Sequence, residues 1–278
     1  MERTATGPAT AASPPLAGTP LPDGAPAVPA QELAGLLDGM PRQRGIEAPG
    51  SAPVQAPSAA SRPWLRHLLP TPAGTPFTFA YAAVLAVTSL FASLADPGLV
   101  HSLHQASSTD VAHLLRAPAL VLPASALWVA GGIVSPYAVA FVLVLTGLER
   151  RTGGARAACV FLTGHVLATL ATEVPVGLAV LFGHLPVSSL HRLDYGISFG
   201  VAASTGALAG LLAPWLRWPL LTLVTGMLLD DLAAFQDPMT NWGHLIALTI
   251  GVACWPLVRR WQRTGAAAPR ARAAVSAG

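Results

Sequence analysis

The sequence predicts an all-α, polytopic membrane protein in which six transmembrane helices form one bundle. Three observations lead to this fold class: the composition, six long apolar runs, and the placement of arginine between them. The 278 residues are 53% hydrophobic and only 10% charged, with a mean hydropathy of +0.54. Soluble domains average about 25% charged residues, so the composition indicates a chain whose main partner is the lipid bilayer. No basic patch is interleaved with aromatic residues, and we expect no nucleic-acid partner.

The six apolar runs are each close to the length that crosses a bilayer, which is about 20 residues. They cover residues 77–94, 130–148, 157–181, 198–213, 219–234 and 240–258. The fourth and fifth runs are a little short, and Pro214 and Pro219 predict a tight connection between them. The stretch 117–129 is also apolar, but it is short and contains Pro118 and Pro123. We expect an interfacial or re-entrant segment there.

Arginine lies mainly in alternate connections between the runs. It occurs before the first run, between the second and third, between the fourth and fifth, and after the sixth, at Arg62, Arg66, Arg150, Arg151, Arg156, Arg217, Arg259, Arg260 and Arg263. The other connections are rich in aspartate and contain only Arg116 and Arg192. Because cytoplasmic loops carry an excess of Lys and Arg, the pattern predicts a multi-pass protein of the plasma (cytoplasmic) membrane with both termini in the cytoplasm.

Two polar tails are expected to flank the membrane domain of residues 71–263. Residues 1–70 are rich in Pro, Ala, Gly, Ser and Thr, and residues 264–278 have a similar composition with added arginine. Such segments cannot bury enough apolar surface to offset the entropy lost on ordering, so both tails are predicted to be disordered. Residues 31–39 are the one place in the first tail where a helical turn or two is expected. No apolar core follows a basic start, so we expect no cleaved signal peptide.

One serine and one histidine open the fourth and sixth runs. Ser198 follows Gly196 in the segment Asp194-Tyr195-Gly196-Ile197-Ser198-Phe199-Gly200, and His244 ends the segment Asn241-Trp242-Gly243-His244. In the predicted topology both runs begin at the outer surface and run inward, so Ser198 and His244 lie at similar depth.

Small residues make a close approach of these two runs plausible. Ser198, Ala202 and Gly206 follow one another at four-residue spacing in the fourth run, and Ala247 and Gly251 do so in the sixth. In lipid, such small-xxx-small surfaces let helix backbones pack closely. The sequence therefore predicts that the fourth and sixth helices pack directly against each other.

That packing would bring a nucleophile to a base. A serine hydroxyl becomes a good nucleophile when an imidazole within hydrogen-bond reach takes its proton, and Gly196 would let the backbone approach a substrate closely. The alternative is structural: a serine in a membrane helix often bonds its own backbone, and a histidine at a helix end is often an interfacial polar group.

The order of these segments resembles the rhomboid intramembrane serine proteases, and in particular the actinobacterial rhomboid-like group with an Asp-x-Gly-x-Ser-aromatic-Gly signature. The resemblance covers roughly residues 77–261. It includes Gly147-Leu148-Glu149-Arg150 with Gly153 and Gly154 after it, and the long loop that follows the first run. It implies a six-helix rhomboid-like bundle, with Ser198 as the nucleophile and His244 as the general base.

The chain departs from the usual rhomboid pattern at three places. Phe199 follows the serine where glycine is usual, Ala202 stands where an aromatic residue often packs on the histidine, and residues 133–137 lack the His-x-x-x-Asn motif that helps to form the oxyanion hole. Replacement donors would be the Ser198 amide, Asn241 or Ser125. The departures keep open an alternative function, a catalytically inactive rhomboid-like protein that binds membrane helices.

Two further polar residues, His165 and Glu173, lie eight positions apart in the third run, on roughly one helix face. Ionisable residues inside a bilayer are costly and are functional candidates. No close-spaced ligand pair accompanies them, so a structural or proton-linked contact is favoured over zinc, and no metal or cofactor is expected.

The sequence thus predicts an intramembrane serine endopeptidase that cuts single-span membrane proteins near the outer face. A small transporter is the third hypothesis. It is less favoured because no internal repeat with broken helices occurs.

Overall fold

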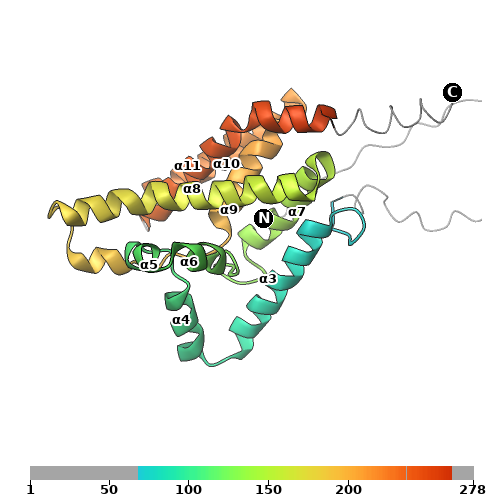
Figure 1. Cartoon of the computed structure of the whole chain (residues 1–278). Helices are drawn as coiled ribbons and strands as arrows, with labels where there is room; N and C mark the ends of the chain where they lie inside the picture. Colours follow the sequence, from blue (N-terminus) through green and yellow to red (C-terminus); the bar gives the residue numbers. More distant parts are fainter. Residues whose placement is uncertain (1–67, 236, 265–278) are drawn as a thin grey trace, which may run out of the picture. The chain divides into compact units, whose positions relative to one another are not determined.

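The computed structural model describes residues 68–235 and 237–264. The tails predicted at 1–70 and 264–278 lie almost wholly outside these residues, as do the helical turns expected at 31–39. The described chain is helical and contains no strand, which confirms the all-α prediction. In chain order the elements are α3 (Pro76–Leu94), α4 (Pro97–Ala106), α5 (Val111–Arg116), α6 (Pro118–Ser125), α7 (Pro136–Thr152), α8 (Gly154–Leu181), the 3-10 helix η1 (Val187–His191), α9 (Ser198–Ala209), α10 (Pro214–Ala233) and α11 (Pro238–Ala253), followed by a last helix, Trp255–Thr264 (Figure 1).

Proline and short polar side chains define where several of these helices begin. Proline occupies the first turn of α7 and of α11, where its missing N–H has no helical partner to lose. The residue before each proline caps the helix: the Ser135 side chain accepts from the Tyr137 amide, and that of Asp237 accepts from the Thr240 amide. The second predicted run therefore becomes helical only at Pro136.

Two helices, α3 and α8, are individually long and apolar enough to cross a membrane. A third candidate joins α11 to the last helix, with a bend of 45° between them. Pro256 follows directly on Trp255 at this bend, and its ring cannot continue the hydrogen bonding of α11. The count of six spans stays a prediction.

The ends of the helices that carry most of the arginines gather at one end of the bundle. One buried cluster there joins the end of α7, the start of α8, the end of α9 and the last helix through Leu148, Ala157, Ala207 and Val258. At the opposite end Arg192, which precedes α9, contacts Asp237 and Thr240 at the start of α11. Successive long helices from α7 onward therefore run in alternate directions, which is compatible with the predicted topology.

Helix α9 is the buried centre of the bundle, with its residues from Phe199 onward all buried. It packs against α8 and α11 at backbone distance. A Cβ atom added to Gly251 would lie 1.9 Å from the Ala203 carbonyl oxygen, and one added to Gly206 would lie 2.3 Å from the Leu248 carbonyl oxygen. Towards α8, a Cβ on Gly164 would lie 2.1 Å from the Ala203 Cβ. The predicted close packing of the fourth and sixth runs is confirmed, and α8 joins it.

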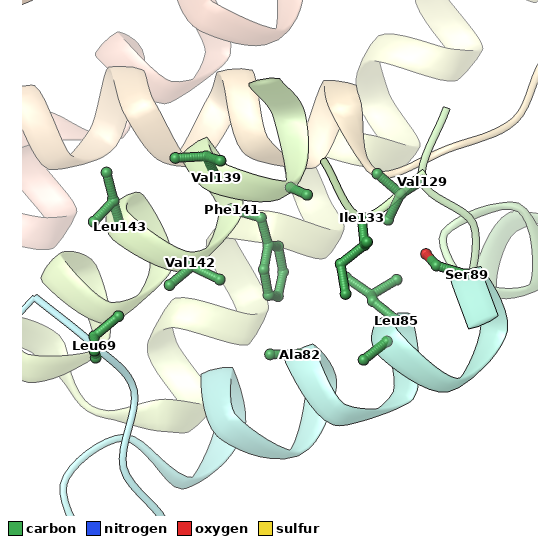
Figure 2. A pocket seen from close by; sticks show the side chains of 12 residues that line it. Leu69, Ala82, Leu85, Ser89, Val129, Ile133, Val139, Phe141, Val142 and Leu143 are labelled. Carbon is green, nitrogen blue, oxygen red and sulfur yellow. The ribbon is translucent and has the colours of Figure 1, made fainter. Parts of the chain in front are cut away.

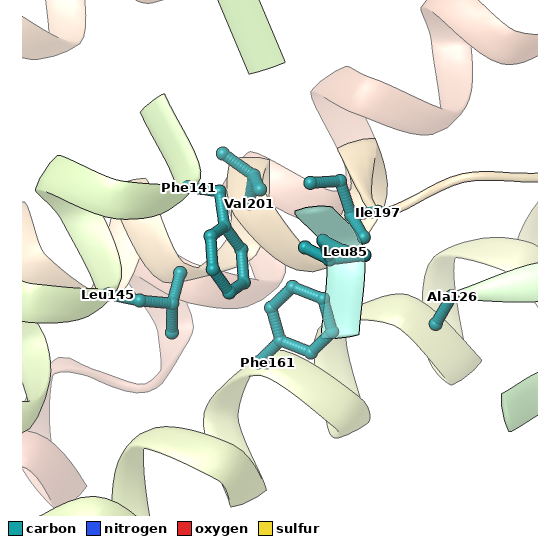
Figure 3. Packing of buried hydrophobic residues seen from close by; sticks show 7 residues of the cluster. All are labelled: Leu85, Ala126, Phe141, Leu145, Phe161, Ile197 and Val201. Carbon is teal, nitrogen blue, oxygen red and sulfur yellow. The ribbon is translucent and has the colours of Figure 1, made fainter. Parts of the chain in front are cut away.

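Aromatic side chains fill the space between α3, α7 and α8. The Tyr81 ring meets Phe141 and Phe161 edge-on, with centroid distances of 5.1 and 5.3 Å. Figure 3 shows how Phe141 and Phe161 lie together with Ile197, which directly precedes α9, and with Val201 in the first turn of α9. This core holds the start of α9 against the first helices of the bundle.

A carboxylate near the end of α7 caps the start of α3. Glu149 is 3% exposed and accepts hydrogen bonds from the amides of Phe77 and Thr78, at 3.0 and 2.7 Å, and from the Thr78 hydroxyl at 2.6 Å. Gly154 leaves room for it, since a Cβ there would lie 2.8 Å from a Glu149 oxygen. The segment that carried part of the rhomboid resemblance therefore satisfies amides that a helix start leaves unpaired.

The substitution Gly251→Ala tests the close packing of α9 and α11. The added methyl has to displace the Ala203 carbonyl, because the two would otherwise overlap, and overpacking typically costs about 1–3 kcal/mol. We expect a clear fall in the thermal unfolding temperature of the detergent-solubilised protein. Gly226→Ala in α10 is the matched control, since nothing lies within 4 Å of its added Cβ. Equal unfolding temperatures for the two variants would contradict the packing.

Candidate active site at the head of α9

Ser198 is the first residue of α9 and is half-buried. The residues before it are held by backbone hydrogen bonds to the end of α6 and the segment that follows. The Gly196 amide donates to the Ser125 carbonyl at 2.9 Å, and the Ile197 amide donates to the Trp128 carbonyl at 3.2 Å. Gly196 has φ +121°, a value that favours glycine. The structure thus brings Gly196 and Ser125 together beside Ser198.

No side chain caps the start of α9. The first amides of a helix have no partner within the helix, so the amide of Ser198 points its hydrogen out of the N-terminal end. This end carries the positive pole of the helix dipole. It is a suitable place for a developing negative charge.

His244 lies in the first half of α11 and is 3% exposed. Its ring is held by two aromatic side chains: Tyr137 stacks on it with a centroid distance of 5.4 Å and an interplanar angle of 24°, and Phe199 meets it edge-on at 5.2 Å and 75°. Both ring nitrogens are buried, and neither has a hydrogen-bond partner among the described residues. Buried polar atoms are rarely left unpaired, so this arrangement calls for an explanation.

Ser198 and His244 therefore lie at the same end of the α9–α11 contact, and no hydrogen bond joins them. Phe199, the neighbour of Ser198, is the residue that touches the imidazole. In apo enzymes catalytic hydrogen bonds are often long and tighten only with substrate. The dyad stays a prediction.

The other two predicted donors form hydrogen bonds elsewhere. The Asn241 side-chain amide donates to the Asp231 carbonyl at 3.0 Å and ties α11 to the end of α10. The Ser125 hydroxyl is fully buried, donates to the Leu122 carbonyl at 3.0 Å, and lies 3.0 Å from Nε2 of His165. Neither side chain is free to stabilise an oxyanion without giving up these bonds.

His165 and Glu173 share the buried face of α8 but have separate partners. Nε2 of His165 lies 3.1 Å from the Leu122 carbonyl, so the histidine holds α6 against α8. Glu173 is 1% exposed and forms an ion pair with Arg192. Both residues therefore have structural contacts.

Arg192 is the centre of a charged cluster beside the candidate site. Apart from Glu173, its guanidinium lies 3.9 Å from the Asp194 carboxylate, 3.4 Å from that of Asp237, and 3.0 Å from the Thr240 hydroxyl. Burial raises the pKa of Asp194, and the positive charge of Arg192 opposes this only in part. The cluster fastens the segment before α9 to α8 and α11, and so fixes the position of Ser198.

Sequence reasoning missed Tyr137 and the role of Arg192. Tyr137 lies within residues 133–137, where the His-x-x-x-Asn motif was sought, and it supplies the aromatic contact that Ala202 does not. Arg192 was visible as one of two arginines in the acidic connections, an exception that pointed to buried carboxylate partners.

The described residues contain no group of three or more His, Cys, Asp or Glu side chains that could hold a metal ion.

An apolar groove of about 390 Å³ lies between α3 and α7 and includes Leu85, Ile133 and Val139 in its lining (Figure 2). Neither Ser198 nor His244 is among its lining residues.

Comparison with known proteins supports the resemblance. The sequence model of the rhomboid-like protein family matches residues 73–264. No curated protein and no solved structure gave a match. The family match covers most of the chain and includes every helix from α3 to the last one. The family match and the apolar helices together indicate a membrane protein. The chain belongs to the rhomboid-like protein family.

Proposed function

We propose that this protein is an intramembrane serine endopeptidase that cuts single-span membrane proteins near the outer face, with Ser198 as the nucleophile and His244 as the general base. The observation that supports this most strongly is the buried His244 ring, whose two nitrogens have no partner among the described residues, beside the uncapped start of α9. A base kept free of other hydrogen bonds is available to the serine hydroxyl.

The proposed reaction has two steps. In the first, His244 takes the proton of the Ser198 hydroxyl as its oxygen attacks the scissile carbonyl carbon, and the imidazolium then gives this proton to the leaving amine. In the second, His244 takes a proton from water as the water oxygen attacks the acyl-serine ester, and it returns this proton to the Ser198 oxygen as the ester bond breaks and the acid leaves. The negative oxygen formed each time would be stabilised by amides at the start of α9, including that of Ser198.

Tyr137 and Phe199 would act as positioning residues. A Ser–His dyad has no third residue to orient its histidine, and these two rings would do so instead. Tyr137 stacks on the imidazole and restrains its plane, and Phe199 meets it edge-on and limits its translation. We infer that Tyr137 takes the place of the aromatic residue that rhomboids usually carry one turn after the serine.

The alternative is a catalytically inactive protein that binds membrane helices. It is favoured by one specific observation: the Ser125 and Asn241 side chains are bonded elsewhere. The oxyanion would then rest on backbone amides alone. Loss of one oxyanion donor costs on the order of a hundredfold to a thousandfold in rate, so an active enzyme is expected to be slow.

The proposed orientation has six spans in the plasma membrane with both termini in the cytoplasm. It can be tested with single cysteines in a chain in which Cys159 and Cys254 are replaced by alanine. An impermeant maleimide applied to intact cells should label His184→Cys, which is exposed between α8 and η1. It should leave Ala155→Cys and Gly278→Cys unlabelled until the membrane is permeabilised. Labelling of Ala155→Cys in intact cells would contradict the orientation.

A fluorophosphonate probe tests the dyad in the purified protein. We expect slow labelling of the wild type, none of Ser198→Ala, and a rate lower by on the order of a hundredfold or more for His244→Ala, because members of a nucleophile–base pair act as a unit. Ser93→Ala is the matched control: this serine is exposed on α3, where it bonds only the Leu90 carbonyl, and labelling should be unchanged.

Three results would count against the protease. Labelling that persists in Ser198→Ala rules out this serine as the reactive group. Equal rates in wild type and His244→Ala remove the base. A wild type that stays unlabelled and leaves single-span membrane proteins intact favours the inactive helix binder.

A further inference from the structure

Two arginine side chains from different helices meet at the end of α9 that is opposite to Ser198. Arg217 of α10 donates from Nε to the Ala209 carbonyl at 2.9 Å and from Nη2 to the Leu212 and Gly210 carbonyls at 2.7 and 3.4 Å. Arg259 of the last helix donates from Nε to the same Gly210 carbonyl at 3.0 Å. One carbonyl oxygen thus holds two guanidinium groups close together.

An indole ring joins the pair. The guanidinium carbons of Arg217 and Arg259 lie over the Trp255 ring, at 5.1 and 5.0 Å from its centroid, within the usual range of a cation–π contact. Trp255 is itself fixed, since its Nε1 donates to the Gly206 carbonyl at 2.8 Å. The two charges therefore lie on a rigid support at the bend between α11 and the last helix.

In the part of the chain that the structure describes, no carboxylate forms an ion pair with Arg217 or Arg259. The ion pairs found among the described residues lie at other places in the fold. The carbonyls at the end of α9 supply only the partial negative charge of a helix C-terminus, about half a unit. The pair therefore keeps an excess of positive charge.

Several N–H groups of the pair remain available. Nη1 of Arg217 and both Nη atoms of Arg259 form none of the hydrogen bonds found in the described part of the chain. Both side chains are half-buried, so these groups are reachable from outside. The planar fork of a guanidinium fits the oxygens of a phosphate in a bidentate manner.

The surroundings place this charge at the depth of lipid headgroups. Trp215 and Trp218, in the first turns of α10, are 72% and 59% exposed, and exposed tryptophans of membrane proteins concentrate at the membrane–water interface. Arg260 and Arg263 are exposed on the same last helix. Basic pockets between helices at this depth bind anionic headgroups.

We propose that Arg217 and Arg259, supported by Trp255, form a binding site for the phosphate of an anionic phospholipid. The two guanidinium groups bind the phosphate oxygens, while the acyl chains lie along the apolar surface near Trp215 and Trp218. The site is independent of proteolysis, and it would fasten the end of α9 and the bend after α11 to the bilayer surface.

Native mass spectrometry of the full chain in detergent tests this assignment. We expect the first molecule of dioleoyl phosphatidylglycerol to bind about tenfold more tightly than dioleoyl phosphatidylcholine. Arg259→Gln should lower the affinity for phosphatidylglycerol about tenfold. Arg260→Gln removes the same charge from an exposed neighbour, and should change it by no more than the roughly fivefold effect of a diffuse surface charge. Arg259→Lys keeps the charge without the fork and should give an intermediate loss. It also serves as the test if Arg259→Gln fails to fold.

Two outcomes would overturn the proposal. Equal losses in Arg259→Gln and Arg260→Gln would mean that only diffuse electrostatics attract the lipid. Competition arms with inorganic phosphate and glycerol 3-phosphate distinguish the source of the anion. If either displaces phosphatidylglycerol at equal concentration, the site binds a soluble anion and the lipid assignment is wrong.

Discussion

The backbones of α8, α9 and α11 approach one another around Ala203 more closely than any larger side chains would allow. Gly164 of α8 and Gly251 of α11 both approach this residue, and Gly206 meets the backbone of α11 one turn further on. Between membrane helices there is little hydrophobic driving force, so such van der Waals contact at small residues is a main source of association. Helices α7 and α10 pack in turn against α9, and α3 packs against α7 and α8.

The contact has a direct consequence for chemistry. Because α9 is buried along its length, the arginine side chains that bind its backbone do so at its end. At one end the uncapped amides and Ser198 lie near His244, and the Arg192 cluster fastens the preceding segment. At the other end the carbonyls of Ala209, Gly210 and Leu212 are satisfied by arginine. The same buried helix thus presents its positive pole to the proposed active site and its negative pole to a cationic cluster.

Much of this arrangement could be predicted from the sequence, for identifiable reasons. The start of α9 at Ser198 and the contact of Gly206 and Gly251 with the facing backbones follow from apolar run boundaries and small-residue spacing, which are local signals. The partners of Glu149 and the role of Gly164 could not be predicted. A small or polar residue in a membrane helix does not by itself indicate which neighbouring helix it will contact. Because α9 is apolar on every face, its sequence does not indicate which neighbour lies where.

The candidate site was harder to predict than the fold. Sequence analysis could single out Ser198, His244 and Gly196, because polar residues and glycine are conspicuous at the boundaries of apolar runs. The ring that stacks on His244, in contrast, belongs to Tyr137, more than a hundred positions away in the chain. The hydrogen bond between Ser125 and His165 likewise joins residues forty positions apart. Such pairings depend on how α6 and α7 fold back on α8 and α11, which no local pattern encodes.

Catalysis as proposed depends on the close contact of α9 and α11, which would present Ser198 to His244. A crystal structure of the full chain after treatment with a fluorophosphonate tests this most directly. We expect a phosphonyl adduct on the Ser198 oxygen, with a nitrogen of His244 within about 3 Å of that oxygen and a phosphonyl oxygen directed at the amides of α9. An unmodified Ser198, or an adduct with the His244 ring turned away behind Tyr137 and Phe199, would contradict it.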